Sequence, residues 1–233
     1  MDLPALDWQF FYGRLAWTIV LATIVASLLP AAMRRSRPVI FGLLFATAML
    51  MALPDGASPA YWLVLAFQWP SGVLLGCCLM KLNAAKAGLP AITSMPTSIA
   101  AVIALAGTAL YLDAIGLLSL GLYYWGFGPY GAPMVALVAG ASCALAVILG
   151  RGRPHTVVAV GALALFSILR LPTGNLWDAL LDPLLWGWAV VSLTIKCGRW
   201  LARKARAATQ QSGHGVDAEP QIASARVAGI EHF

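Results

Sequence analysis

Long apolar stretches, separated by short polar or turn-forming segments, dominate this sequence. An α-helix needs about 20 mostly apolar residues to cross a bilayer. We predict seven membrane-spanning helices, at residues 10–31, 39–54, 60–80, 95–112, 132–150, 155–170 and 182–200. The second and third are separated by residues 54–59, whose proline, aspartate and glycine end helices. The pattern therefore predicts an all-α fold, a polytopic bundle of about seven transmembrane helices.

The composition agrees with this pattern and excludes soluble classes of protein. The chain has 233 residues, of which 61% are hydrophobic and 10% charged, and its mean hydropathy is +0.82. Soluble domains are about 45–50% apolar and about 25% charged. So few charges cannot cover a water-facing surface. We expect a multi-pass protein of a cell membrane, the inner membrane if the source is Gram-negative, surrounded by membrane lipids.

The basic residues indicate the orientation of the bundle. Most of the 15 lysines and arginines fall in connections between alternate spans, near residues 34–37, 81–86, 151–153 and 196–206. The acidic residues outside the tail fall on the opposite side. Cytoplasmic loops are enriched in Lys and Arg, so we predict an outside N-terminus and a cytoplasmic C-terminus. The net charge of +6 then reflects topology and attraction to anionic lipids rather than nucleic-acid binding.

Two stretches of the chain resemble each other. Arg-Ser-Arg-Pro at 35–38 opens the second span, which ends in Leu-Pro-Asp-Gly, and Arg-Gly-Arg-Pro at 151–154 opens the sixth, which ends in Leu-Pro-Thr-Gly. We interpret this as a parallel 3+1+3 internal repeat, residues 10–80 and 132–200, related by an axis along the membrane normal. The alternative is that both motifs are ordinary loop and turn sequences.

This interpretation divides the chain into two parts. Residues 1–206 form the transmembrane helical domain, in which the span at 95–112 and an outer loop at 113–131 link the two repeats. Residues 207–233 lack helical periodicity and are predicted to be a disordered cytoplasmic tail. The second and sixth spans are short, and paired short segments in corresponding halves point to the substrate site of a transporter.

The sequence offers no visible catalytic chemistry. The histidines, His155, His214 and His232, lie at a helix mouth or in the tail, which excludes haem ligation within the bundle and His-based triads. We therefore predict no catalytic, cofactor-binding or metal-binding residues, and no cofactor. Asp178 and Asp182 lie four residues apart, and a helix start carrying acids is a simpler interpretation of them than a catalytic pair.

Two groups of residues are candidates for function. Within the predicted spans Gln68 is the clearest polar group, followed by Arg14, and such residues line a pathway or join helices. The second group is an aromatic-rich surface on the outer face, which we interpret as a binding surface for a partner or a glycan. The alternative is an ordinary belt of aromatic residues at the membrane interface. Its members are Tyr123, Tyr124, Trp125, Tyr130, Trp177, Asp178 and Asp182.

Three functions fit these features. The first is a non-enzymatic structural or assembly subunit of a cell-envelope machine for polymer export or secretion, which associates with other membrane proteins or with itself. The second is a small carrier for a neutral solute, built from the 3+1+3 repeat. The third is a membrane enzyme acting on a lipid-linked substrate, for which no nucleophile–base set is visible. The sequence favours them in that order.

Overall fold

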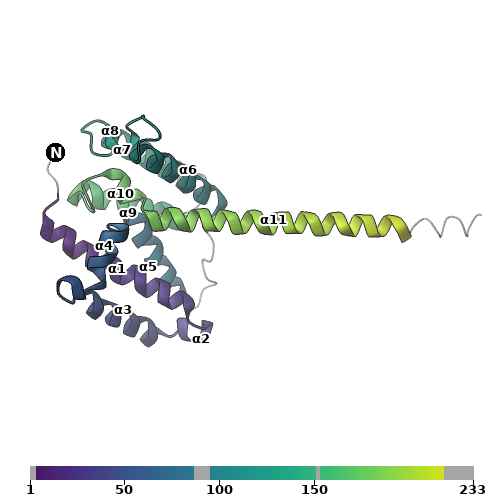
Figure 1. Cartoon of the computed structure of the whole chain (residues 1–233), viewed down its shortest axis with the longest axis horizontal. Helices are drawn as coiled ribbons and strands as arrows, with labels where there is room; N and C mark the ends of the chain where they lie inside the picture. The colour runs from purple at the N-terminus through teal and green to yellow at the C-terminus, as the bar shows by residue number, and fades with distance from the viewer. Residues whose placement is uncertain (1–3, 87–94, 151–152, 218–233) are drawn as a thin grey trace, which may run out of the picture. The chain divides into compact units, whose positions relative to one another are not determined.

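In a computed structural model, which describes residues 4–86, 95–150 and 153–217, the chain is all α-helical (Figure 1). Within these residues there are eleven α-helices and one short 3-10 helix, η1. Their bounds are α1 Leu6–Leu28, α2 Ala31–Arg34, α3 Arg37–Met51, η1 Asp55–Ala57, α4 Pro59–Phe67, α5 Gly72–Lys86, α6 Thr97–Ala114, α7 Leu122–Trp125, α8 Gly131–Ile148, α9 Arg153–Leu169, α10 Leu176–Leu180 and α11 Pro183–Asp217. Each of the seven apolar segments predicted from the sequence contains helix.

Three of these helices are long and apolar enough to cross a membrane. They are α1 with 23 residues and α6 and α8 with 18 residues each. α3, α5 and α9 are apolar but shorter. The chain is thus an all-α protein with three candidate membrane spans among its described residues, which suggests a multi-pass membrane protein.

The third predicted span is not one helix. α4 ends at Phe67 and α5 begins at Gly72, so the segment predicted at 60–80 is interrupted. Gln68 has a φ of 61°, a left-handed conformation that ends α4. Pro70 follows, and a proline cannot donate the backbone hydrogen bond that would continue a helix.

A second interruption precedes the last helix. α10 ends at Leu180, Leu181 is extended, and α11 begins at Pro183. Proline is favoured at the first position of a helix, where its missing N–H costs nothing. Each of these two segments is therefore a short helix, a break and a longer helix. We call Gln68 to Ser71 the first break and Leu181 to Asp182 the second break.

In the main unit, residues 1–190, α1, α8 and α10 pack against the central pair α5 and α9. α1 lies against α3, α4 and α5, α5 lies against α9, and α9 lies against α8 and α10 (Figure 1). Close approach of α5 and α9 depends on Gly72 and Gly76. A Cβ added to Gly72 would lie 2.9 Å from Ala162 Cβ, and one on Gly76 would lie 2.6 Å from Val158 Cγ1. These small residues bring the two helices into direct contact.

The remaining part of α11, from Val191 onward, belongs to a second unit. α11 continues to Asp217, past residue 206, where the sequence predicts the end of the helical domain. Lys204 Nζ lies 4.2 Å from the centre of the Trp200 ring, a cation–π contact on an exposed part of the helix. Residues 218–233 of the predicted tail lie outside the described residues.

Candidate functional site

The two breaks meet at the carboxylate of Asp182. Its Oδ1 accepts a hydrogen bond of 2.8 Å from the N–H of Leu185, in the first turn of α11. Its Oδ2 accepts one of 2.8 Å from the N–H of Ser71, immediately before α5. The first N–H groups of a helix have no partner within the helix. Asp182, only 4% exposed, thus satisfies backbone groups at the starts of two helices.

Ser71 caps α5 in the same way as Asp182 caps α11. The N–H of Leu74 donates to Ser71 Oγ over 3.0 Å, which is the usual N-cap geometry. On its other side the first break is held by α1, because the Tyr12 hydroxyl donates to the carbonyl of Pro70 over 2.7 Å. The Trp69 ring packs over Gly13, at which a Cβ would overlap that ring. Backbone groups freed by the break therefore have buried partners.

A second polar cluster surrounds Asp178 on α10. The Thr173 hydroxyl donates to its Oδ2 over 2.5 Å, and the Tyr123 hydroxyl lies 3.1 Å from both carboxylate oxygens. Asn175 caps α10 by accepting from the N–H of Trp177 over 2.9 Å. Hydrogen bonds from Asn175 and Trp177 to backbone carbonyls of α7 join that short helix to α10. The cluster therefore fixes α7 against α10.

Burial governs ionisation in this cluster. It raises the pKa of the Asp178 carboxyl above its ordinary 3.8, opposed by the hydrogen bonds from Thr173 and Tyr123 and reinforced by the charge of Asp182. Burial, together with the charge of Asp178, raises the pKa of Tyr123 to about 12. Tyr123 is consequently protonated at neutral pH, and its hydroxyl donates a hydrogen bond to the Asp178 carboxylate.

A cavity of about 400 Å³ lies between the two breaks, α6, α7 and α10. That volume is within the range of small-molecule sites. Gln68, Asp178 and Asp182 supply polar groups to its wall. Five aromatic side chains line it as well, namely Phe67, Trp69, Tyr111, Tyr123 and Trp177. The cavity thus combines carboxylates, one amide and aromatic rings.

The structure divides the predicted outer-face surface into residues that line the cavity and residues that are exposed. Of the predicted outer surface, Tyr123, Trp177, Asp178 and Asp182 line the cavity. Tyr124, Trp125 and Tyr130 are instead exposed, at 74%, 52% and 84%. Gln68 lines the cavity at the first break, whereas Arg14 is exposed on α1 and is not among the described residues of the cavity wall.

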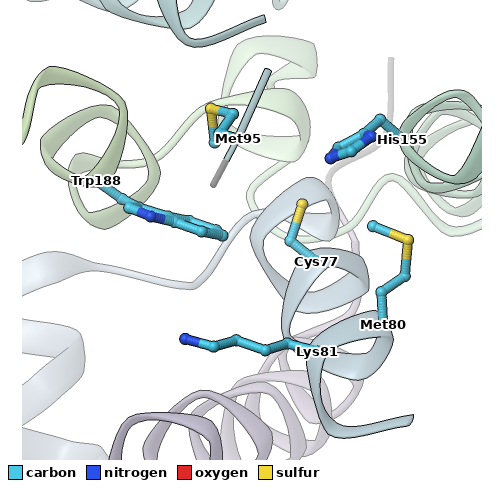
Figure 2. A pocket seen from close by; sticks show the side chains of 6 residues that line it. All are labelled: Cys77, Met80, Lys81, Met95, His155 and Trp188. Carbon is cyan, nitrogen blue, oxygen red and sulfur yellow. The ribbon is translucent and has the colours of Figure 1, made fainter. Parts of the chain in front are cut away.

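A second cavity is much smaller, at about 10 Å³, and lies among α5, α9 and the start of α11 (Figure 2). Figure 2 shows the Cys77 sulfur and the His155 ring facing the same space. A volume of this size holds about one water molecule. Within residues 4–86, 95–150 and 153–217, no group of three or more His, Cys, Asp or Glu is placed to hold a metal ion. The larger cavity is therefore the candidate site for a solute.

Ser71, Thr173 and Tyr111 were not predicted from the sequence, whereas Asn175 stands out there as a polar neighbour of Trp177 and Asp178. Ser71 and Asn175 each precede a helix, and polar residues there are typical caps. The signal for the first break was Pro70 followed by Ser71 and Gly72, inside a segment interpreted as one continuous span. Nothing in the sequence near Thr173 or Tyr111 indicates that they lie at a shared site.

No family model, curated protein or solved structure matches this chain.

Proposed function

We propose that this protein is a small-solute carrier whose substrate binds in the 400 Å³ cavity. The single observation that carries the proposal is the meeting of two interrupted helices at the Asp182 carboxylate, on the wall of that cavity. Carriers commonly build their sites at the breaks of discontinuous helices. In this chain the helix starts are capped by Asp182 and Ser71, and the side chains of Gln68, Asp178 and the aromatic residues line the cavity beside them.

The positions of the breaks support the internal repeat. Each follows a short helix that begins with a polar cap, Ser58 for α4 and Asn175 for α10. Each precedes a longer helix in which the N–H of the third residue donates to the capping side chain. These donors are Leu74 in α5, bonded to Ser71, and Leu185 in α11, bonded to Asp182. We infer that residues 10–80 and 132–200 are parallel repeats, and that the chain crosses the membrane seven times with its N-terminus outside. The cavity then opens toward the outer side.

Neither alternative explains the cavity as well. An assembly subunit of an envelope machine requires no interior site, although the exposed aromatics Tyr124, Trp125 and Tyr130 are compatible with a partner surface. An enzyme requires a reactive group. The oxygens of Asp178 and Asp182 already accept hydrogen bonds from hydroxyl or backbone groups. Both carboxylates therefore act as fixed charges and caps rather than as a nucleophile and a base.

Alternating access tests the proposal without knowledge of the substrate. The native cysteines are replaced by serine, and a single cysteine is introduced as Leu110→Cys or Ala66→Cys, both on the cavity wall. A membrane-impermeant maleimide is then applied to right-side-out and to inside-out vesicles. A carrier exposes its site to each side in turn, so we expect both variants to be labelled in both preparations.

The matched control is Gly140→Cys on α8, where an added Cβ meets no atom within 4 Å. It lies within a candidate span, and we expect no labelling from either side. Labelling of positions 66 and 110 from the outside alone contradicts the carrier and indicates a static vestibule. A stoichiometric set of envelope proteins in a gentle-detergent pull-down then favours the assembly subunit.

A further inference from the structure

The charge on the cavity wall is negative. Asp178 and Asp182 both line it, and among the described residues of the wall there is no lysine, arginine or histidine. The groups that donate to the two carboxylates are hydroxyls and backbone N–H groups, which carry no full charge. Because a negative potential inside a cavity of low dielectric attracts cations, this wall disfavours an anionic solute.

The aromatic rings of the wall are held in place from behind. Phe67, Trp69, Tyr111 and Tyr123 each pack against a ring that is not part of the wall, at centroid distances between 5.5 and 6.3 Å. Those supporting rings are Trp17, Phe10, Trp186 and Phe127. The fifth ring, Trp177, is fixed by its Nε1 hydrogen bond of 2.9 Å to the carbonyl of Leu122. The cavity is thus lined by pre-oriented aromatic side chains.

We propose that the solute carried is a small organic cation of the quaternary ammonium class, held by the aromatic wall and the Asp178 charge. This inference rests on the carrier function proposed above. Aromatic rings attract alkylammonium groups through their quadrupoles, and a set of such rings is a common site for them. A quaternary ammonium needs no hydrogen-bond acceptor, which suits carboxylates whose oxygens are already engaged.

The hydrogen bonding distinguishes this solute from a sugar. Aromatic faces also bind sugar rings, but a sugar needs several free polar groups for its hydroxyls. The Asp178 oxygens already accept from Thr173 and Tyr123, and those of Asp182 accept from the starts of α5 and α11, so the wall offers a sugar mainly the Gln68 amide. The sequence predicted a neutral solute, because no carboxylate falls in the middle of a predicted span. In the structure Asp178 and Asp182 line the cavity, and we therefore propose a cation instead.

A pair of isosteric probes tests the charge alone. Choline and 3,3-dimethylbutan-1-ol have nearly the same shape, but only choline is charged. Binding of each to the purified full-length protein is measured by calorimetry and by tryptophan fluorescence, because Trp69 and Trp177 line the cavity. We expect choline to bind at least about tenfold more tightly, equivalent to about 1.4 kcal/mol. Glucose serves as the neutral sugar probe.

Two variants and a control assign the preference to the cavity. Asp178→Asn removes one of the two carboxylates of the wall and is expected to reduce the preference for choline several-fold. Tyr111→Leu removes one ring and is expected to weaken choline binding several-fold while leaving the neutral isostere unaffected. Asp7→Asn makes the same charge change at an exposed position outside the cavity wall, and should leave both affinities unchanged.

The outcomes separate this inference from the carrier proposal. Equal binding of choline and its isostere, tighter binding of glucose, or no binding of any probe overturns the cationic substrate. The carrier proposal survives those results if positions 66 and 110 are labelled from both sides of the membrane. If labelling is confined to one side, the carrier proposal fails, and the substrate inference fails with it.

Discussion

The two breaks have similar backbone roles but different chemistry. At the first break the capping side chain is the neutral Ser71, and the neighbouring polar group is Gln68. At the second break the cap is Asp182, and Asp178 lies four residues before it. A serine hydroxyl satisfies one helix start, whereas the carboxylate of Asp182 reaches from its own helix to the other break. The second break therefore carries a charged side chain, Asp182, that bonds to both breaks. The first break has no charged side chain and is held by its contacts with Asp182 and with Tyr12 of α1.

Replacing Asp182 should have the largest effect, because it removes the group shared by both breaks. Asp182→Ala leaves the N–H groups of Ser71 and Leu185 without their acceptor. Hydrogen bonds to a charged group contribute about 1.5–3 kcal/mol each, so we expect a loss of about 3 kcal/mol or more in unfolding free energy. Thermal unfolding in one detergent, followed by tryptophan fluorescence, measures the change.

Asp182→Asn is the graded control for that experiment. Its amide oxygen can accept one of the two hydrogen bonds, and we expect roughly half of the loss. Equal, small effects of both variants, within about 0.5 kcal/mol, would show that Asp182 does not join the breaks.

Replacing Ser71 should have a smaller effect, because its backbone N–H still donates to Asp182 after the hydroxyl is removed. Ser71→Ala removes one neutral cap and keeps the backbone N–H that donates to Asp182. Loss of an N-cap typically costs about 1 kcal/mol. Ser142→Ala on α8 is the control, since its hydroxyl is exposed and bonds only within its own helix. A Ser71→Ala loss as large as that of Asp182→Ala would contradict the asymmetry between the breaks.

The smallest effect concerns the titration of Asp178. Because burial raises its pKa in the folded protein, the stabilisation from its protonated form is complete below the ordinary pKa of 3.8 and is lost as the pH rises through the raised pKa. The side chain of Asp178→Asn does not titrate. As the pH rises through that window, we therefore expect the Tm of the wild type to fall relative to the Tm of the variant. A difference that stays constant with pH would contradict the burial of this charge.

Much of the architecture could be predicted from periodicity and composition. The apolar stretches are helical because a helix satisfies its own backbone groups, a requirement that is local. Turn residues placed the ends of most helices within a few positions. The prediction failed at 60–80, where apolar residues continue through the first break, and hydropathy does not distinguish one helix from two.

The sequence by itself determined that the chain is helical and apolar, and that Gln68, Trp177, Asp178 and Asp182 are the polar or aromatic features in need of a role. Only the tertiary structure decided that they line one cavity while Arg14 does not. The bond between Ser71 and Asp182 joins residues 111 positions apart. Local sequence dictates that a helix start has unpaired N–H groups, but packing through Gly72 and Gly76 decides which distant carboxylate satisfies them.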